Sequence, residues 1–137
     1  MLVDTCVLSE VQHPRGDANV KAAFAALPGD AIHLSVVTIG ELTKGITALA
    51  PGARRRGLTD WLAQIIQNTE GRLLPVSLPV ATRWGEVTAR AASKGRAVPP
   101  ADGLIAATAI EHGLRVMTRN VADFEPTGVL TVNPWER

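Results

Sequence analysis

The chain has 137 residues, of which 46% are hydrophobic and 20% are charged. These values fit one compact domain spanning residues 1–137, and they exclude both a multidomain assembly and wholesale disorder. The 14 basic and 13 acidic side chains leave a formal charge of +1, so composition alone indicates neither a nucleic-acid binder nor an acidic-surface binder.

The chain has one cysteine, Cys6, which excludes an intrachain disulfide. A chain without disulfides is typical of a reducing compartment, so we expect a cytoplasmic protein. No stretch approaches the ~18 consecutive apolar residues that a membrane span requires, and the first residues lack the basic and apolar regions of a signal peptide. We therefore expect no membrane attachment.

Short β-like runs alternate with longer helical patterns along the chain. The predicted strands are 2–5, 32–35, 73–76, 116–118 and 129–132, and the predicted helices are 18–27, one from about 38 to the Pro51-Gly52 stop, 53–70, 80–93 and 101–112. Helices of ten or more residues between strands imply crossover connections. The sequence therefore predicts an α/β fold with a mostly parallel five-stranded sheet that is covered on both faces.

Acidic residues follow the strands at four points of this pattern. In such sheets, ligands bind outside the carboxyl ends of the strands, so residues at the strand-to-helix turns are candidate site residues. They are Asp4 at the end of the first strand, Glu41 in the first turn of the helix after the second, Asp102 at the start of the helix after Pro99-Pro100, and Asp123 in the loop after the fourth.

Each acid also has a plain structural interpretation. Asp4 or Asp102, taken singly, can be a helix cap, and Asp123 can be an exposed loop residue. Glu41 lies among apolar neighbours, where a charged group needs a partner. Four carboxylates at one edge of a sheet would repel each other unless a cation lay between them. Oxygen ligands of this kind suit Mg²⁺ or Mn²⁺.

The residues that could form other sites do not cluster in the sequence. His13, His33 and His112 are far apart, and we interpret them as surface or packing residues rather than zinc ligands. Cys6 has no evident base beside it, so we interpret it as a small buried filler rather than a nucleophile.

Four segments also resemble those of a known family. They read LVDTCVLSE at 2–10, LSVVTIGEL at 34–42, ADGLIAATA at 101–109 and TRNVADF at 118–124. In this order they resemble the PIN-domain nucleases, and more narrowly the VapC-type toxins of prokaryotic toxin–antitoxin pairs. The FitB-like branch of that group also ends in a segment similar to VNPW at 132–135. The resemblance covers the whole chain.

The resemblance implies a PIN-like three-layer αβα sandwich and a ribonuclease that depends on Mg²⁺ or Mn²⁺. It also implies a homodimer and a small DNA-binding antitoxin, VapB-like, as partner in a higher-order assembly. Asp4, Glu41 and Asp102 match the three best-defined acids of the family's metal site. The fourth position is matched either by Asn120 or by Asp123. Cys6 stands where many relatives have Asn, which puts a polar contact there in doubt.

The chemistry implied is hydrolysis of RNA phosphodiester bonds by a carboxylate-bound metal. Asp4, Asp102 and Asp123 are proposed ligands, while Glu41 binds the metal or orients the attacking water. The tentative substrate contacts are Thr118, Arg119, Arg15 and Arg96, and Arg54, Arg55 and Arg56 are further candidates to grip phosphates. Aromatic residues make up only 4% of the chain, so recognition of the RNA backbone is expected rather than base stacking.

Two other functions are compatible with the same residues. A haloacid-dehalogenase-type phosphatase would use an Asp after the first strand as nucleophile, but it requires a second acid where Cys6 stands. A weakly catalytic or non-catalytic PIN-domain partner would instead regulate DNA binding by the antitoxin complex. Metal-dependent RNA cleavage by the purified chain separates this second alternative from the enzyme. In the family, the antitoxin tail lies near residues 38–70.

Overall fold

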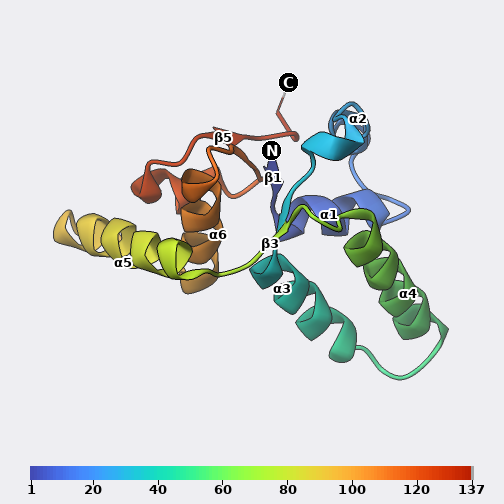
Figure 1. Ribbon diagram of the computed structural model, residues 1–137. Helices are drawn as coiled ribbons and strands as arrows, with labels where there is room; N and C mark the ends of the chain where they lie inside the picture. The colour runs from blue at the N-terminus through green and yellow to red at the C-terminus, as the bar shows by residue number, and fades with distance from the viewer. Residues whose placement is uncertain (137) are drawn as a thin grey trace.

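The computed structural model describes residues 1–136 and contains five short strands joined by helices (Figure 1). The strands are β1 (Leu2–Val3), β2 (Leu34–Ser35), β3 (Leu73–Leu74), β4 (Val116–Met117) and β5 (Thr131–Val132). The helices are α1 (Thr5–Gln12), α2 (Ala18–Ala25), α3 (Val36–Thr47), α4 (Ala53–Asn68), α5 (Leu78–Ser93), α6 (Pro100–Glu111) and α7 (Val121–Phe124), with 3-10 turns η1 (Gly29–Ala31) and η2 (Glu125–Thr127).

All pairs of strands are parallel, as the sequence predicts. One sheet has the order β1-β4-β5, and the other consists of β2 and β3. A parallel bridge between Leu2 and His33 joins the two sheets, with the Val3 N–H donating to the His33 carbonyl at 3.0 Å and the His33 N–H donating to the Met1 carbonyl at 3.0 Å. The spatial order is therefore β3-β2-β1-β4-β5. Each strand is shorter than predicted because only two of its residues form ladder pairs.

Alternation along these strands creates two apolar faces. Val3, Met117 and Leu34 belong to a buried cluster that also holds side chains from α1 to α4. Leu2 and Val116 belong to a second cluster, on the opposite face, with residues of α6 and α7. Because successive residues of a strand point to opposite faces, two-residue strands suffice to supply both clusters. The three-layer αβα sandwich is thus confirmed.

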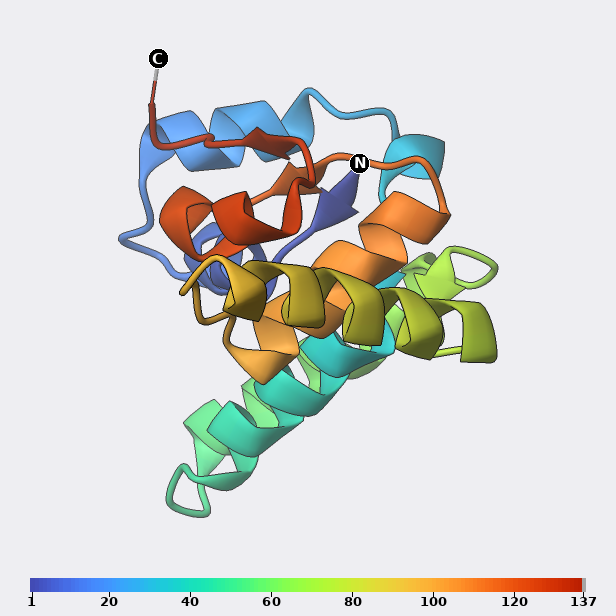
Figure 2. The same ribbon diagram turned by 90° about the vertical axis from the view of Figure 1, so that its left-hand side faces the viewer.

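The helices on the two faces differ in how they are arranged. In Figures 1 and 2, α3 and α4 form a hairpin that projects from the body, and α5 lies alongside α6. The contact between α5 and α6 is close at Gly103, where an added Cβ would lie 3.0 Å from the Trp84 ring. Glycine at this point lets the two helices approach each other.

Side-chain caps explain where several helices begin. Asp17 accepts hydrogen bonds from the Asn19 and Val20 N–H groups at the start of α2, and Ser35 accepts one from Val37 at the start of α3. Ser35 ends β2 and caps α3 at once, so α3 begins two residues earlier than predicted. Glu41 consequently lies in the second turn of α3 and not in its first.

Two helices of the structure were not predicted from the sequence. Helix α1, Thr5–Gln12, directly follows the first strand, and Asp4 caps it; a cap was one interpretation of Asp4, but no helix was predicted after it. The four-residue helix α7 carries Asp123, which was expected in a loop. Helices this short carry too few residues for an apolar periodicity to stand out. Within residues 1–136, no helix is long and apolar enough to span a membrane.

Phe124 anchors α7, so its removal should destabilise the fold. The side chain is 0% exposed within the second cluster, and we expect Phe124→Ala to lower the free energy of unfolding by about 3–5 kcal/mol. Leu130→Ala, at a side chain that is 69% exposed, should change it by less than about 0.5 kcal/mol. Urea unfolding measures both, and equal effects of the two variants would contradict this assignment of the core.

Candidate metal centre and adjoining groove

The strand order reverses direction at β1, because the chain moves to β2 and β3 on one side and then returns to β4 and β5 on the other. Such a switch point opens a crevice beyond the carboxyl ends of the central strands. Asp4 follows β1 at this point, Thr118 follows β4, and the helix that carries Glu41 follows β2. Asp102 comes from the first turn of α6, which begins at the same edge.

Asp4 is the most firmly held of these acids. It is 3% exposed, and its Oδ1 accepts a hydrogen bond from the Thr5 N–H at 2.8 Å. Its Oδ2 accepts a hydrogen bond from the fully buried Thr118 hydroxyl at 2.7 Å, which ties the end of β1 to the end of β4. Asp4 is therefore a helix cap, as its plain interpretation suggested, and it is also the fixed point of the acidic site.

Thr118 was a tentative substrate contact, and the structure places it elsewhere. Its hydroxyl is 0% exposed, donates to Asp4 and accepts the Asn120 N–H at 3.0 Å. Both of these contacts are inside the protein, so Thr118 positions Asp4 and does not face a ligand. The correction follows from burial, which the sequence pattern of a short strand end did not show.

Glu41 is exposed and is oriented by hydroxyl groups. The Thr5 hydroxyl lies 2.7 Å from Glu41 Oε1 and 3.2 Å from the Thr38 hydroxyl. The sequence predicted that this carboxylate needs a partner, and the partner in the structure is the hydroxyl of a threonine of α1 rather than a charged group. Neither Thr5 nor Thr38 was predicted as a site residue, although Thr5 stands in the Asp-Thr pair of the first motif.

Asp102 shows that the four acids share one environment. Burial raises the pKa of Asp102, and the negative charges of Asp4, Asp123 and Glu41, in that order, raise it further, to about 6. An ionised carboxylate repels a neighbouring one, so each of these acids makes the ionisation of Asp102 harder. Asp4, Asp123 and Glu41 are therefore near enough to Asp102 to make its ionisation harder.

The donors fit an oxygen-seeking divalent cation, although they are not closed around one point. In the described part of the chain, no three acidic, histidine or cysteine side chains stand in a ready-made metal cage. A cation between the carboxylates would offset the part of the raised Asp102 pKa that comes from the neighbouring negative charges. The chemistry of the set, carboxylates alone, suits Mg²⁺ or Mn²⁺.

Asn120 and Asp123 differ in their relation to this set. The Asn120 N–H binds Thr118, and the Asn120 side chain makes no capping hydrogen bond to α7. Asp123 lies in the single turn of α7, and its charge acts on Asp102. Of the two candidates for the fourth position, Asp123 is the one with an electrostatic effect on the other acids.

Cys6 lies at the edge of the acidic site. Its Sγ is 3.5 Å from Asp4 Oδ2 and 3.6 Å from the Thr118 hydroxyl, and the residue is half-buried rather than buried. Burial and the Asp4 charge raise the pKa of the Cys6 thiol. The group stays protonated and is a poor nucleophile, in agreement with the sequence-based interpretation.

The predicted arginine contacts lie in three different places. The Arg119 guanidinium sits 5.3 Å from the centroid of the Trp135 ring, directly after the Thr118 that binds Asp4. Arg96 forms an ion pair with Glu125 at 3.5 Å. Arg15 follows the C-terminal end of α1, so the whole length of that helix separates it from the acid that caps the other end.

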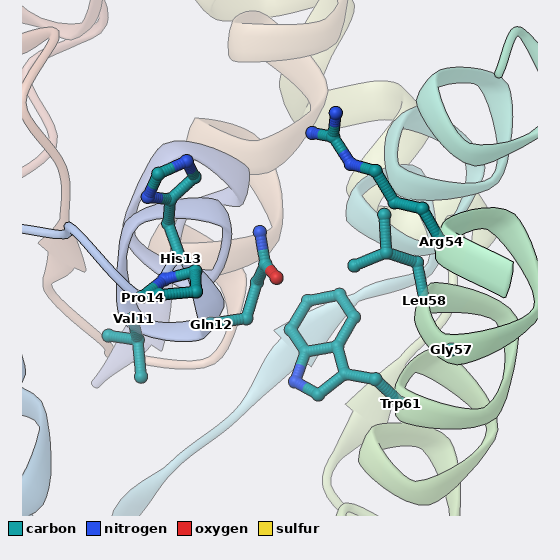
Figure 3. A pocket seen from close by; sticks show the side chains of 8 residues that line it. All are labelled: Val11, Gln12, His13, Pro14, Arg54, Gly57, Leu58 and Trp61. Atoms are coloured by element: carbon teal, nitrogen blue, oxygen red, sulfur yellow. The ribbon is translucent and has the colours of Figure 1, made fainter.

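A groove adjoins the acids between α1, α3 and α4. One cavity, of about 190 Å³, is lined by Thr5 and Glu41 and reaches Arg54 and Trp61. A second cavity, of about 640 Å³, continues from the same two residues to His13 at the end of α1. Figure 3 shows the indole of Trp61 facing the α1 side chains across this hollow. The sequence predicted apolar helices here but did not show that they leave a groove.

Comparisons with known proteins agree with this geometry. The PIN domain family model matches residues 1–126. The chain is 35% identical over 137 residues to VapC ribonuclease Y4jK of Sinorhizobium fredii, with 99% of this chain and 98% of the relative covered. It is 36% identical over 136 residues to Toxin FitB of Neisseria gonorrhoeae, with 98% of each covered.

Solved structures show the same fold. The crystal structure of FitAcB from Neisseria gonorrhoeae matches with a TM-score of 0.95 and 36% identity, and 99% of each chain is covered. A structure of FitAB bound to an IR36 DNA fragment matches with a TM-score of 0.95 and 34% identity, over 99% of this chain and 96% of that one. The family resemblance read from the four motifs is confirmed.

The raised pKa of Asp102 gives a prediction for the chain without divalent ions. We expect the Asp102 carboxyl carbon to titrate near pH 6 by NMR, and Asp123→Asn to lower that pKa because one repelling charge is removed. Asp60→Asn, at an exposed residue of α4, serves as the control and should leave it unchanged. A midpoint near the ordinary value of 3.8 would contradict the proximity of the acids.

The same shift links stability to pH. Because the folded-state pKa of Asp102 lies above its unfolded value, the folded chain binds the proton more tightly. The stabilisation from this group is fully present below about pH 3.8 and is lost as the pH rises through about 6.

Proposed function

The chain belongs to the PIN-domain family, and from this premise we propose that it is a metal-dependent endoribonuclease and the toxin of a type II toxin–antitoxin pair. The observation that carries the proposal is the cluster of four carboxylates that act on one another beyond β1 and β4. The name of one relative, a VapC ribonuclease, supports RNA as the substrate.

The cluster supplies the ligands for the metal. Asp4, Asp102 and Asp123 hold Mg²⁺, or Mn²⁺, and Glu41 either joins them or orients the attacking water. When bound, the cation offsets the negative charge that develops on the phosphodiester and activates water at neutral pH. The fit rests on an all-carboxylate donor set whose repulsion is unrelieved in the protein alone.

The chain's own residues prepare this site for the reaction. Thr118 and the Thr5 amide fix both oxygens of Asp4, so this ligand loses little further freedom when the site assembles. The Thr5 hydroxyl fixes one oxygen of Glu41 and leaves the other free to hold a water or accept a proton. The buried Asp4 thus serves as a fixed metal ligand, and the exposed Glu41 serves as a base that faces solvent.

An antitoxin is the proposed partner that silences the enzyme. The groove between α1, α3 and α4 begins at Glu41 and is long and partly apolar, which suits an extended segment with apolar side chains and a basic residue at its acidic end. The similar FitAB structure, bound to DNA, supports a DNA-binding partner for this chain. With RNA as the substrate and a DNA-binding protein as the partner, we propose a cytoplasmic location.

We further propose a homodimer that assembles with the antitoxin. Val36, Val76 and Leu78 follow the paired ends of β2 and β3, and Leu78 is 81% exposed. An apolar side chain of this size in water at the edge of a sheet favours burial against a second copy. This edge is separate from the groove, so both partners have room.

Ribonuclease activity is tested with the purified chain, labelled RNA and Mg²⁺. We expect cleavage by the wild type, and a loss of rate of roughly 100-fold or more for Asp4→Asn and for Asp102→Asn, beyond the usual effect of losing an outer-shell partner. Asp60→Asn is the matched control for the loss of one negative charge and should cleave at the wild-type rate. Circular dichroism confirms that each variant is folded.

Two results of this assay would contradict the proposal. Cleavage by Asp4→Asn at the wild-type rate would remove the carboxylate site from the mechanism. A folded wild type that leaves RNA intact with either Mg²⁺ or Mn²⁺ would favour the regulatory role, in which the domain only modulates DNA binding by its partner.

The antitoxin groove gives a separate prediction. The Trp61 indole lines both cavities of the groove, and large aromatic side chains contribute strongly to interfaces. We expect Trp61→Ala to weaken binding of the antitoxin encoded beside this chain by about 2 kcal/mol or more, measured by calorimetry. Ile66→Ala, which removes an exposed side chain of α4 outside the groove, should leave the affinity unchanged. An equal effect of the two variants would place the partner elsewhere.

A further inference from the structure

A second hollow lies at the C-terminal end of α5 and shares no lining residue with the groove. It has a volume of about 320 Å³, and its walls carry Arg90, Lys94, Arg96 and Glu125 over a floor that includes Val87. We call this hollow the basic cleft. The three cations come from the last turn of α5 and the loop that follows it, and Glu125 comes from η2.

The cations of the basic cleft are only partly neutralised. Arg96 and Glu125 form an ion pair at 3.5 Å, with side chains that are 48% and 68% exposed. Arg90 and Lys94 are exposed, and within residues 1–136 neither has an acidic group at ion-pair distance. Three positive charges therefore face one negative charge in a concave surface, a shape that focuses an electrostatic field.

The end of a helix accounts for only part of this cluster. The carbonyl dipoles at the C-terminus of α5 favour cations such as Arg90 and Lys94 nearby. Arg96 lies beyond the helix, and its loop turns it back toward the same hollow. The convergence of a loop cation with two helix cations points to an anionic ligand.

Residues of the basic cleft are close in the sequence to two acids of the proposed metal centre. Arg96 stands six residues before Asp102, in the segment that leads into α6, and Glu125 stands two residues after Asp123. The end of α5 packs against η2, and α6 packs against both α7 and η2. Figure 2 shows these segments gathered on one side of the molecule. A strand leaving the acids along this side would meet the cleft.

We propose that the basic cleft binds a backbone phosphate of the RNA strand next to the stretch that is being cut. The proposal rests on the ribonuclease function proposed above. Arg90 and Arg96 donate N–H groups to the phosphate oxygens, and Glu125 is a competing anion that the phosphate displaces from Arg96. A phosphate site without aromatic neighbours in its walls holds the strand irrespective of its bases.

The test measures RNA binding apart from RNA cleavage. All chains carry Asp4→Asn, so that a labelled single-stranded oligoribonucleotide stays intact in Mg²⁺, and affinity is read by fluorescence anisotropy across a range of salt concentrations. Adding Arg90→Gln and Arg96→Gln should raise Kd roughly tenfold and reduce the slope of log affinity against log salt by about 0.7, the value for one lost phosphate on a single strand. Adding Glu125→Gln instead should lower Kd severalfold.

The matched control removes two exposed cations that lie outside the basic cleft, Lys44 of α3 and Arg115 before β4. Lys44→Gln with Arg115→Gln changes the net charge equally and should alter Kd less than twofold. An equal loss in this control would reduce the effect to general electrostatics and overturn the proposal. An unchanged Kd in the cleft variant would overturn it as well. Because the site contacts phosphate and not the 2′-hydroxyl, single-stranded DNA of the same sequence should lose affinity to a similar extent.

Failure of the two proposals can be told apart. If the chain with Asp4 intact cleaves RNA but the cleft variant binds RNA with unchanged affinity, the proposed ribonuclease function is supported and the proposed phosphate site is wrong. If the cleft variant loses affinity for RNA while the chain with Asp4 intact does not cleave RNA, the basic cleft binds RNA and the proposed ribonuclease activity is wrong.

Discussion

The mutual repulsion of carboxylates at one edge of the sheet is the constraint on which the rest of the molecule depends. Folding brings Asp4, Glu41, Asp102 and Asp123 near one another from distant parts of the chain, and the negative charges of the other three add to the effect of burial in raising the pKa of Asp102. The fold compensates locally: both oxygens of Asp4 accept hydrogen bonds, and Glu41 accepts one. A bound cation would offset the repulsion between these carboxylates and would stabilise the folded chain. A site of this kind therefore links metal binding to folding.

The parts of the fold that could be predicted are those with a repeated signal. The long helix α4 begins at Ala53 as predicted. The predicted strand 73–76 is too long, because β3 ends before Pro75, which lacks an N–H for the ladder. The parts that could not be predicted are too short for periodicity to act: α1 and α7 were missed, and each strand keeps only two residues. The acids could still be named as candidate site residues, because a residue lies near the end of a strand even when the predicted length of that strand is wrong by a few residues. A sequence pattern does not show which side chains are buried. Thr118 is buried, so its hydroxyl binds Asp4 from inside the protein instead of facing a ligand.

The acidic centre has two unlike surfaces beside it. The groove that starts at Glu41 is partly apolar and ends near Trp61, whereas the basic cleft beyond Asp102 and Asp123 carries cations and no aromatic side chain. One chain with a formal charge of +1 therefore separates its charges into regions of opposite sign. Net charge describes the average of these regions, and the function proposed here depends on their separation. A protein partner and a nucleic acid can approach the same acids from different sides, so competition between them is confined to the centre.

The single bridge between Leu2 and His33 has a consequence for the acidic centre. It is the seam between the two sheets, and it places β2, with the helix that carries Glu41, on one side, and β1 and β4 on the other. Asp4, Asp102 and Asp123 belong to the second half. The Thr5 hydroxyl, which contacts Thr38 and Glu41 across this seam, and the packing of α3 against α1 and α6 set the spacing between the lone glutamate and its three neighbours. Because the buried cluster of Val3, Leu34 and Met117 spans the seam, the position of the fourth acid relative to the other three is fixed by the core itself.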